Sequence, residues 1–160
     1  MIDDTDLSHL NRCVELAQLA LDEGDQPFGS LIISQDGRVL FEDRNRISGG
    51  DHTQHPEFAI ARWAANNLSE SDRKHAVVYT SGEHCAMCSA AHGWVGLGRI
   101  VYASSTEQFT QWQNELGAPA GPVRALSINE VIPDTPVDGP AEALTERIRA
   151  MHVAYHHRHA

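Results

Sequence analysis

The segment from Thr80 to Cys88, Thr-Ser-Gly-Glu-His-Cys-Ala-Met-Cys, constrains the chain more than any other stretch. It follows a β-branched and aromatic run, Ala76 to Thr80, that predicts a strand, and it opens a run from Cys85 to Trp94 that predicts a helix. Two cysteines with a two-residue gap at a helix start point their sulfurs at one spot. The helix N-terminus also favours the thiolate form that a metal requires. We therefore expect Cys85 and Cys88 to be metal ligands.

A third ligand is needed, and we expect it to be His55 in His55-Pro56-Glu57, where Pro56 suits the first turn of another helix. Sulfur and imidazole ligands select zinc, and three protein ligands leave a fourth position for water. Zinc lowers the pKa of its water towards 7, and a carboxylate that is not a ligand, here Glu57, can carry the proton. The pattern predicts one catalytic zinc per chain and hydrolytic release of ammonia from an amidine-like carbon.

Length, charge and cysteine count limit what this site can belong to. The 160 residues, 41% of them hydrophobic, suit one domain, residues 1–160, with a real core. With 22 acidic against 12 basic residues the net charge is −10, which disfavours a polyanion such as tRNA and favours a small neutral or cationic substrate. Neither a leader sequence nor an apolar run of about 18 residues is present, so we expect a cytoplasmic protein with no membrane partner. Cys13 is interpreted as a buried structural thiol.

Hydrophobic periodicity predicts strands that alternate with helices, hence an α/β architecture with helices on both faces of a mixed sheet. Residues Ser104 to Gly121 show no clean period, and Pro133 to Pro140 is a Pro-rich connector. The other expected elements are a helix capped by Asp6 or Ser8 that runs to Glu23, a hairpin of Phe28 to Ile33 and Val39 to Phe41 continuing towards Asn45, a helix from Pro56 to Leu68, strands Arg99 to Ala103 and Arg124 to Ile128, and a C-terminal helix from Ala141 to His157.

His-x-Glu followed at a distance by Cys-x-x-Cys resembles the zinc-binding signature of the cytidine deaminase-like superfamily. The chain is similar to the branch that contains bacterial guanine deaminases, yeast-type cytosine deaminases and tRNA adenosine deaminases. The resemblance implies a three-layer α/β/α fold with a central mixed sheet of about five strands. It runs from Leu10 to Ala103 and includes Pro27-Phe28-Gly29, Asn45, Thr80-Ser81, Glu83 and Met87.

The resemblance also implies substrate contacts. In the family the position of Asn45 hydrogen-bonds the base, although an Asn there could simply be a turn residue. Phe28 would border the base pocket, or be plain core. His84 stands where the family usually has proline, and it either binds substrate or packs against the turn. Weaker candidates for the pocket or a lid are His52, Trp94, Phe109, Trp112 and Tyr155.

The expected substrate is a free nucleobase or a small aminated heterocycle, with a guanine-like purine preferred because Pro27-Phe28-Gly29 resembles the guanine deaminase pattern. Cytosine-type pyrimidine deamination, tRNA adenosine deamination and a non-catalytic zinc-binding interaction module remain as alternatives. The helix at 141–157 has the length to cover an active site, its own or a partner's. Small residues on the helix opened by Cys85 permit close approach of a second copy, so we expect a homodimer.

Overall fold

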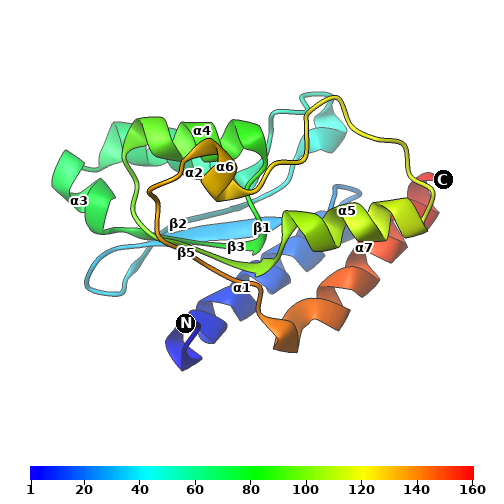
Figure 1. Cartoon of the computed structure of the whole chain (residues 1–160), viewed down its shortest axis with the longest axis horizontal. Coiled ribbons are helices and arrows are strands. Elements are labelled where there is room, and N and C mark those ends of the chain that lie inside the picture. Colours follow the sequence, from blue (N-terminus) through cyan, green and yellow to red (C-terminus); the bar gives the residue numbers. More distant parts are fainter.

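A five-stranded mixed sheet lies at the centre of the computed structural model, which describes residues 1–160 (Figure 1). The strand order is β2-β1-β3-β4-β5. β1 pairs antiparallel with β2 and with β3, whereas β3, β4 and β5 are parallel to one another. This confirms the expected mixed α/β sheet. The strands are β1 (Gly29–Ile33), β2 (Val39–Arg44), β3 (Val77–Gly82), β4 (Ile100–Ser104) and β5 (Val137–Asp138).

Helices cover both faces of the sheet and complete the three layers (Figure 1). One face carries α1 (Asp4–Asp22), α5 (Thr106–Glu115) and α7 (Thr145–His159), which enclose the larger apolar core. The other face carries α2 (Pro56–Asn67), α3 (Glu70–His75), α4 (Ala86–Val95) and α6 (Ile128–Val131), over a smaller core. Two short 3-10 turns, Ile47–Gly49 and Glu142–Leu144, lie in the connections.

β1 is buried along its whole length between the two helical layers. Gly29 in the Pro-Phe-Gly sequence has a packing reason, because a Cβ there would lie 2.4 Å from the Cys13 carbonyl oxygen and 2.5 Å from Leu16 Cβ. α1 therefore presses directly on the β1 backbone. This close approach fixes the position of Ser30 on β1 and of Phe28, which directly precedes the strand.

Two sequence expectations are wrong. Residues 124–128 do not form a strand: 124–127 have no regular secondary structure, and Ile128 begins α6. The last strand is instead β5, which lies inside the Pro-rich connector. Just before β5, the Pro136 carbonyl accepts a hydrogen bond from the Ile100 N–H of β4. α1 begins earlier than expected, because Asp3 is its N-cap and Asp6 completes the capping box from the third helical position.

Three helices were not expected: α3, α5 and the four-residue α6. α5 has a complete capping box made by Ser105 and Gln108, but only Trp112 of its residues is buried. With a single buried anchor, the helix has no apolar stripe for a periodicity argument to detect.

Candidate metal centre and cavity

α2 and α4 bring three ligand atoms together at their N-termini. His55 Nδ1 lies 3.6 Å from Cys85 Sγ and 3.6 Å from Cys88 Sγ, and the three ligand atoms all lie within 4.8 Å of one another. Tetrahedral zinc with bonds of about 2.3 Å to sulfur and about 2.0–2.1 Å to nitrogen places those atoms about 3.6 Å apart. The His55, Cys85 and Cys88 cluster therefore fits one zinc ion, as the spacing predicts.

The two thiols differ in their acidity. A hydrogen bond from Cys88 lowers the pKa of the Cys85 thiol to about 4, against the effect of burial, and His55 adds to the lowering. The same contact with Cys85, together with burial, raises the pKa of Cys88. Both sulfurs bind metal as thiolates, so a metal ion would displace the thiol protons of the pair.

Glu57 is buried beside this cluster, on the first turn of α2. Its Oε1 lies 3.0 Å from the Ser30 hydroxyl and 2.7 Å from the Thr80 hydroxyl. Ser30 and Thr80 face each other across β1 and β3, so the sheet itself supplies both partners. Burial raises the pKa of the Glu57 carboxyl, and the hydrogen bond from Thr80 opposes that rise. Two hydroxyls therefore hold one oxygen of the buried carboxyl group.

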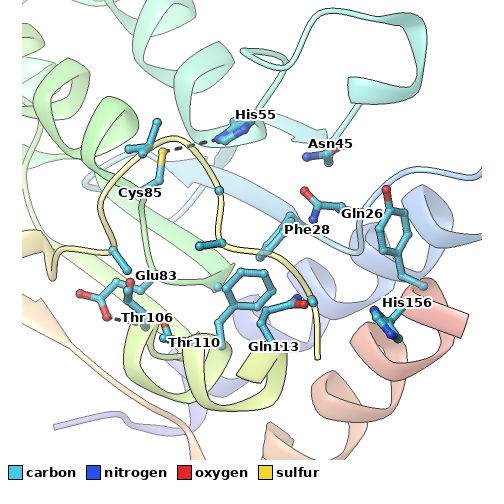
Figure 2. A pocket seen from close by; sticks show the side chains of 18 of the residues that line it. Gln26, Phe28, Asn45, His55, Glu83, Cys85, Thr106, Thr110, Gln113 and His156 are labelled. Carbon is cyan, nitrogen blue, oxygen red and sulfur yellow. Dashed lines mark hydrogen bonds between the residues drawn. The ribbon is translucent and has the colours of Figure 1, made fainter. Parts of the chain in front are cut away.

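A cavity of about 760 Å³ opens from the cluster, and His55, Glu57 and Cys85 line its inner end. Asn45 and Phe28 line it too (Figure 2). Asn45 is buried, and its Oδ1 accepts a hydrogen bond of 3.1 Å from the Ile47 N–H, which leaves its Nδ2 as the free donor. Its own N–H donates to the Phe28 carbonyl.

The Phe28 ring is held in place from two sides. A Cβ on Gly82 would lie 2.8 Å from Phe28 Cε1, so the ring rests directly on the β3 backbone. On the other side it meets Phe109 edge-on, with ring centroids 5.6 Å apart, and His152 at 5.0 Å. His152 is itself buried, and burial lowers its pKa to about 3, so α7 supports the ring with a neutral imidazole. Phe28 is thus a wall of the cavity rather than plain core.

The structure does not bring His84 to the cavity. Its ring is 1% exposed, lies perpendicular to His92 with centroids 5.5 Å apart, and neither ring nitrogen has a hydrogen-bond partner. Burial lowers the pKa of His84 well below its usual range. Of the two roles open from sequence, the geometry matches packing beneath α4.

Glu83 connects the cysteine loop to the outer wall of the cavity. Its carboxylate accepts a 2.9 Å hydrogen bond from the Thr106 N–H at the start of α5 (Figure 2). It also accepts a 2.8 Å bond from the Ile128 N–H at the start of α6. Between these helices, residues 117–127 cross the mouth of the cavity, and many of them line it. The single carboxylate thus ties the start of α5 to the start of α6.

The weaker candidates for the pocket or a lid fall into three groups: residues that line the cavity, a core residue and exposed residues. Phe109 and Tyr155 line the cavity, Trp112 is buried in the core, and His52 and Trp94 are exposed. Cys13 is buried, as expected.

Sequence reasoning missed Ser30 as a partner of Glu57 and Gln26 as a lining residue. A serine inside an otherwise apolar buried strand is the signal that could have identified Ser30.

None of the helices is both long enough and apolar enough to cross a membrane.

Comparisons with known proteins agree with this geometry. Residues 3–104 match the family model described as cytidine and deoxycytidylate deaminase zinc-binding region. A protein named "probable cytosine deaminase" from Schizosaccharomyces pombe is 33% identical over 116 residues, which cover 72% of this chain and 70% of that protein. Guanine deaminase from Bacillus subtilis is 33% identical over 97 residues, 59% of this chain and 62% of that protein. The structure of guanine deaminase from Nitrosomonas europaea covers 98% of this chain and 86% of its own, at 17% identity and a TM-score of 0.70, and so shares the fold.

Proposed function

Since the chain belongs to the family of the cytidine and deoxycytidylate deaminase zinc-binding region, whose members hydrolyse C–N bonds, we propose that it deaminates a free nucleobase or small aminated heterocycle, preferably a guanine-like purine. The observation that carries the proposal is the buried Glu57, held by two hydroxyls beside the three-ligand cluster and open to a cavity. A purely structural zinc module would have no use for a carboxylate desolvated in that position.

Zinc held by His55, Cys85 and Cys88 would supply a Lewis acid that activates water at neutral pH. Glu57 takes one proton from the attacking water and delivers it to a ring nitrogen, and it then takes the proton of the added hydroxyl and delivers it to the departing amino group. Its Oε1 stays anchored on Ser30 and Thr80 through these transfers. Water adds to the amidine carbon, the C–N bond to the amino group breaks, and ammonia leaves.

Asn45 and Phe28 are proposed to orient the ring. The free Nδ2 of Asn45 donates to an acceptor on the ring edge, and the flat face of Phe28, fixed by Gly82, packs against the ring. A guanine-like purine suits this arrangement because it carries ring and carbonyl acceptors as well as the amidine group. The identity with Bacillus subtilis guanine deaminase supports the same choice.

Cytosine-type deamination is the second candidate. The Schizosaccharomyces pombe relative matches over 72% of this chain, more than the 59% covered by the guanine deaminase. Editing of tRNA is disfavoured by the net charge of −10, which opposes a polyanion. Ammonia release from a panel of bases, nucleosides and tRNA separates these functions, and guanine should be the fastest free base. Faster release from cytosine would replace the purine assignment, and release from tRNA alone would contradict a small-molecule substrate.

Replacing Glu57 by Gln tests the mechanism. The amide fills nearly the same volume but cannot carry protons, so we expect zinc content and fold to be kept and kcat to fall by roughly 10²–10⁴-fold or more. Steady-state ammonia release, zinc analysis and circular dichroism are the measurements. Glu70→Gln, an exposed glutamate on α3, is the matched control and should behave as the unmodified enzyme. Turnover within a few-fold of the unmodified enzyme in Glu57→Gln would remove the proton-carrier role.

Two features of assembly complete the proposal. We place the whole chain, residues 1–160, in one domain, in which α7 covers the active site of its own chain: Tyr155 and His156 line the cavity. We also propose a cytoplasmic homodimer that joins along α4, where Trp94 is 91% exposed beside the small residues Ala90 and Gly93.

A further inference from the structure

Residues 117–127, which we call the strap, cross the mouth of the cavity that contains the metal cluster (Figure 2). Ala118 to Gly121 and Val123 to Leu126 line the cavity from this side. Pro119 to Leu126 make no backbone–backbone hydrogen bond, and no strap residue belongs to either apolar core. Segments with few hydrogen bonds and few buried contacts open at little cost in free energy. The position of the strap therefore depends on how its two ends are held.

The two ends of the strap are held in different ways. The first end continues α5 through a 3.0 Å hydrogen bond from the Ala118 N–H to the Gln113 carbonyl. The other end runs into α6, a helix of only four residues whose N-cap, Ser127, makes no side-chain capping bond. The N–H of Ile128, the first residue of α6, donates instead to the Glu83 carboxylate at 2.8 Å. A side chain from another element thus caps the helix in which the strap ends.

Each carboxylate oxygen of Glu83 accepts a hydrogen bond from a different helix. Oε2 accepts from Ile128, and Oε1 accepts from the Thr106 N–H at the start of α5. The Glu83 N–H donates to the Ser104 carbonyl at the end of β4, at 2.8 Å, so the connection is anchored on the sheet. Hydrogen bonds to an ionised carboxylate are roughly twice as strong as those between neutral groups. Glu83 lines the cavity, but its oxygens are occupied by the chain's own backbone.

We propose that Glu83 is a positioning residue for the substrate: by connecting the start of α6 to the start of α5, it keeps the strap closed over the cavity. The proposal rests on the deaminase function proposed above and assigns a role to a residue that takes no part in the chemistry. The closed strap forms one wall of the cavity, so a protein whose strap is open for a larger fraction of the time binds the base more weakly. Proton transfer by Glu57 does not involve the strap, so the chemical step is retained.

Glu83→Gln tests the proposal by kinetics. The amide keeps the size of the side chain, but it turns an NH2 donor towards one of the two N–H groups and so loses that bond. We expect KM for guanine or cytosine, whichever reacts faster, to rise roughly 3- to 10-fold, with kcat within about twofold and zinc content unchanged. Steady-state ammonia release and elemental analysis are the measurements. Glu107→Gln removes an exposed carboxylate from the same first turn of α5 and is the matched control, which should change neither constant.

Thr106→Pro is a second variant, which leaves Glu83 and the cysteine loop untouched. Thr106 is the first residue of α5, where proline is well tolerated, and the change removes the N–H that donates to Glu83. Trypsin reports on the strap without any substrate, because Arg124 is exposed there and is the only arginine or lysine between Arg99 and Arg147. Cleavage after Arg124 should be about tenfold or more faster in Glu83→Gln and also faster in Thr106→Pro. Saturating guanine or cytosine should slow it in the unmodified protein.

The outcomes separate the two proposals. Unchanged cleavage after Arg124 in both variants would overturn the role of Glu83, and so would equal acceleration at Arg62, an exposed residue of α2 that reports general unfolding. Faster cleavage with an unchanged KM would show that the strap does not contribute to binding, and a fall in kcat alone would place Glu83 in the chemistry; either result contradicts a positioning role. If Glu83→Gln does not fold, Thr106→Pro decides by the same measurements. If no compound releases ammonia, the deaminase function fails, whereas faster cleavage after Arg124 in both variants still supports Glu83 as the residue that holds the strap.

Discussion

His55 and Cys85 each occupy the N-cap of a helix, α2 and α4, and neither makes the hydrogen bond that a capping side chain usually makes. Ser, Thr, Asp or Asn at an N-cap instead stabilises a helix by about 0.5–2 kcal/mol over Ala. Both helices forgo this stabilisation at the position where a ligand atom is needed. The metal centre thus uses two helix ends whose side chains are left free to bind.

Zinc content follows directly from this arrangement. The purified protein should carry close to one zinc per chain, and Cys85→Ser combined with Cys88→Ser should lose it, because both thiolates are ligands. Elemental analysis measures the ratio. Cys13→Ala, which removes a buried thiol outside the cluster, is the control and should keep its zinc. Unchanged stoichiometry in the double variant would move the metal to the C-terminal histidines.

For individual residues, the sequence predicted those site residues whose chemistry requires a fixed spacing along the chain. The gap between Cys85 and Cys88, and the offset of Glu57 from His55, are properties of short segments that helix geometry converts into a site. Ser30 could not be recognised in that way, because its role depends on strand pairing with Thr80, a contact across 50 residues.

Among the elements, α1 is tied to the sheet by a buried acidic contact. Asp6 is 3% exposed and accepts hydrogen bonds from Tyr79 Oη at 2.7 Å and from both terminal nitrogens of Arg99 at 3.0 Å. Burial raises the pKa of Asp6, but the bonds from Arg99 and Tyr79 outweigh it and hold the pKa at about 2, below the ordinary 3.8. Arg99 also binds Asp138, so the contact connects α1 with β3, β4 and β5.

The sign of the resulting pH dependence is fixed by that lowered pKa. The stabilisation is fully present above about pH 4 and is lost as the pH falls towards about 2, because the unfolded chain binds the proton first. Asp6→Asn should lower the free energy of unfolding at pH 7 by about 1–3 kcal/mol, and the deficit should shrink through that window. Denaturant titrations at several pH values measure it. Asp4→Asn, exposed in the same helical turn, is the control; an equal effect there would indicate a helix-dipole origin instead.

Whether an element could be predicted depended on where its apolar side chains point. α1 and α2 bury regular apolar faces, and β1 of the hairpin is buried throughout; these elements were predicted. α5 was not, because Trp112 is its only buried residue. β5 was missed because only Val137 and Asp138 pair with β4, too short a run to show alternation between prolines.

For the whole molecule, exposed apolar surface is the main guide to assembly. Trp94 is 91% exposed at the end of α4, on the face of the sheet opposite α1 and α7. Tryptophan is enriched at protein interfaces, where one such residue often contributes much of the binding energy. It lies next to Gly93, over which the chain's own Ile132 packs, so Trp94 is the large exposed side chain on this part of α4.

Trp94→Glu is therefore expected to dissociate the proposed dimer, by placing a charge in the apolar contact. Sedimentation at several micromolar concentrations should give a dimer for the unmodified chain and a mass near 17.6 kDa for the variant. Leu19→Glu, a similar change at a 46% exposed residue of α1, is the control and should remain dimeric. A fully active unmodified protein at 17.6 kDa throughout would rule out the dimer.

The last turn of α7 has a practical consequence for handling the protein. His159 and Ala160 line the cavity, so the carboxyl end of the chain lies at its rim. A polyhistidine purification tag joined there would sit at the substrate entrance and present imidazoles close to a metal centre. The amino terminus pairs instead with Asp138 in an exposed contact, and exposed pairs contribute only about 0–1 kcal/mol. Tags, immobilisation linkers and fluorescent fusions therefore belong on the amino terminus.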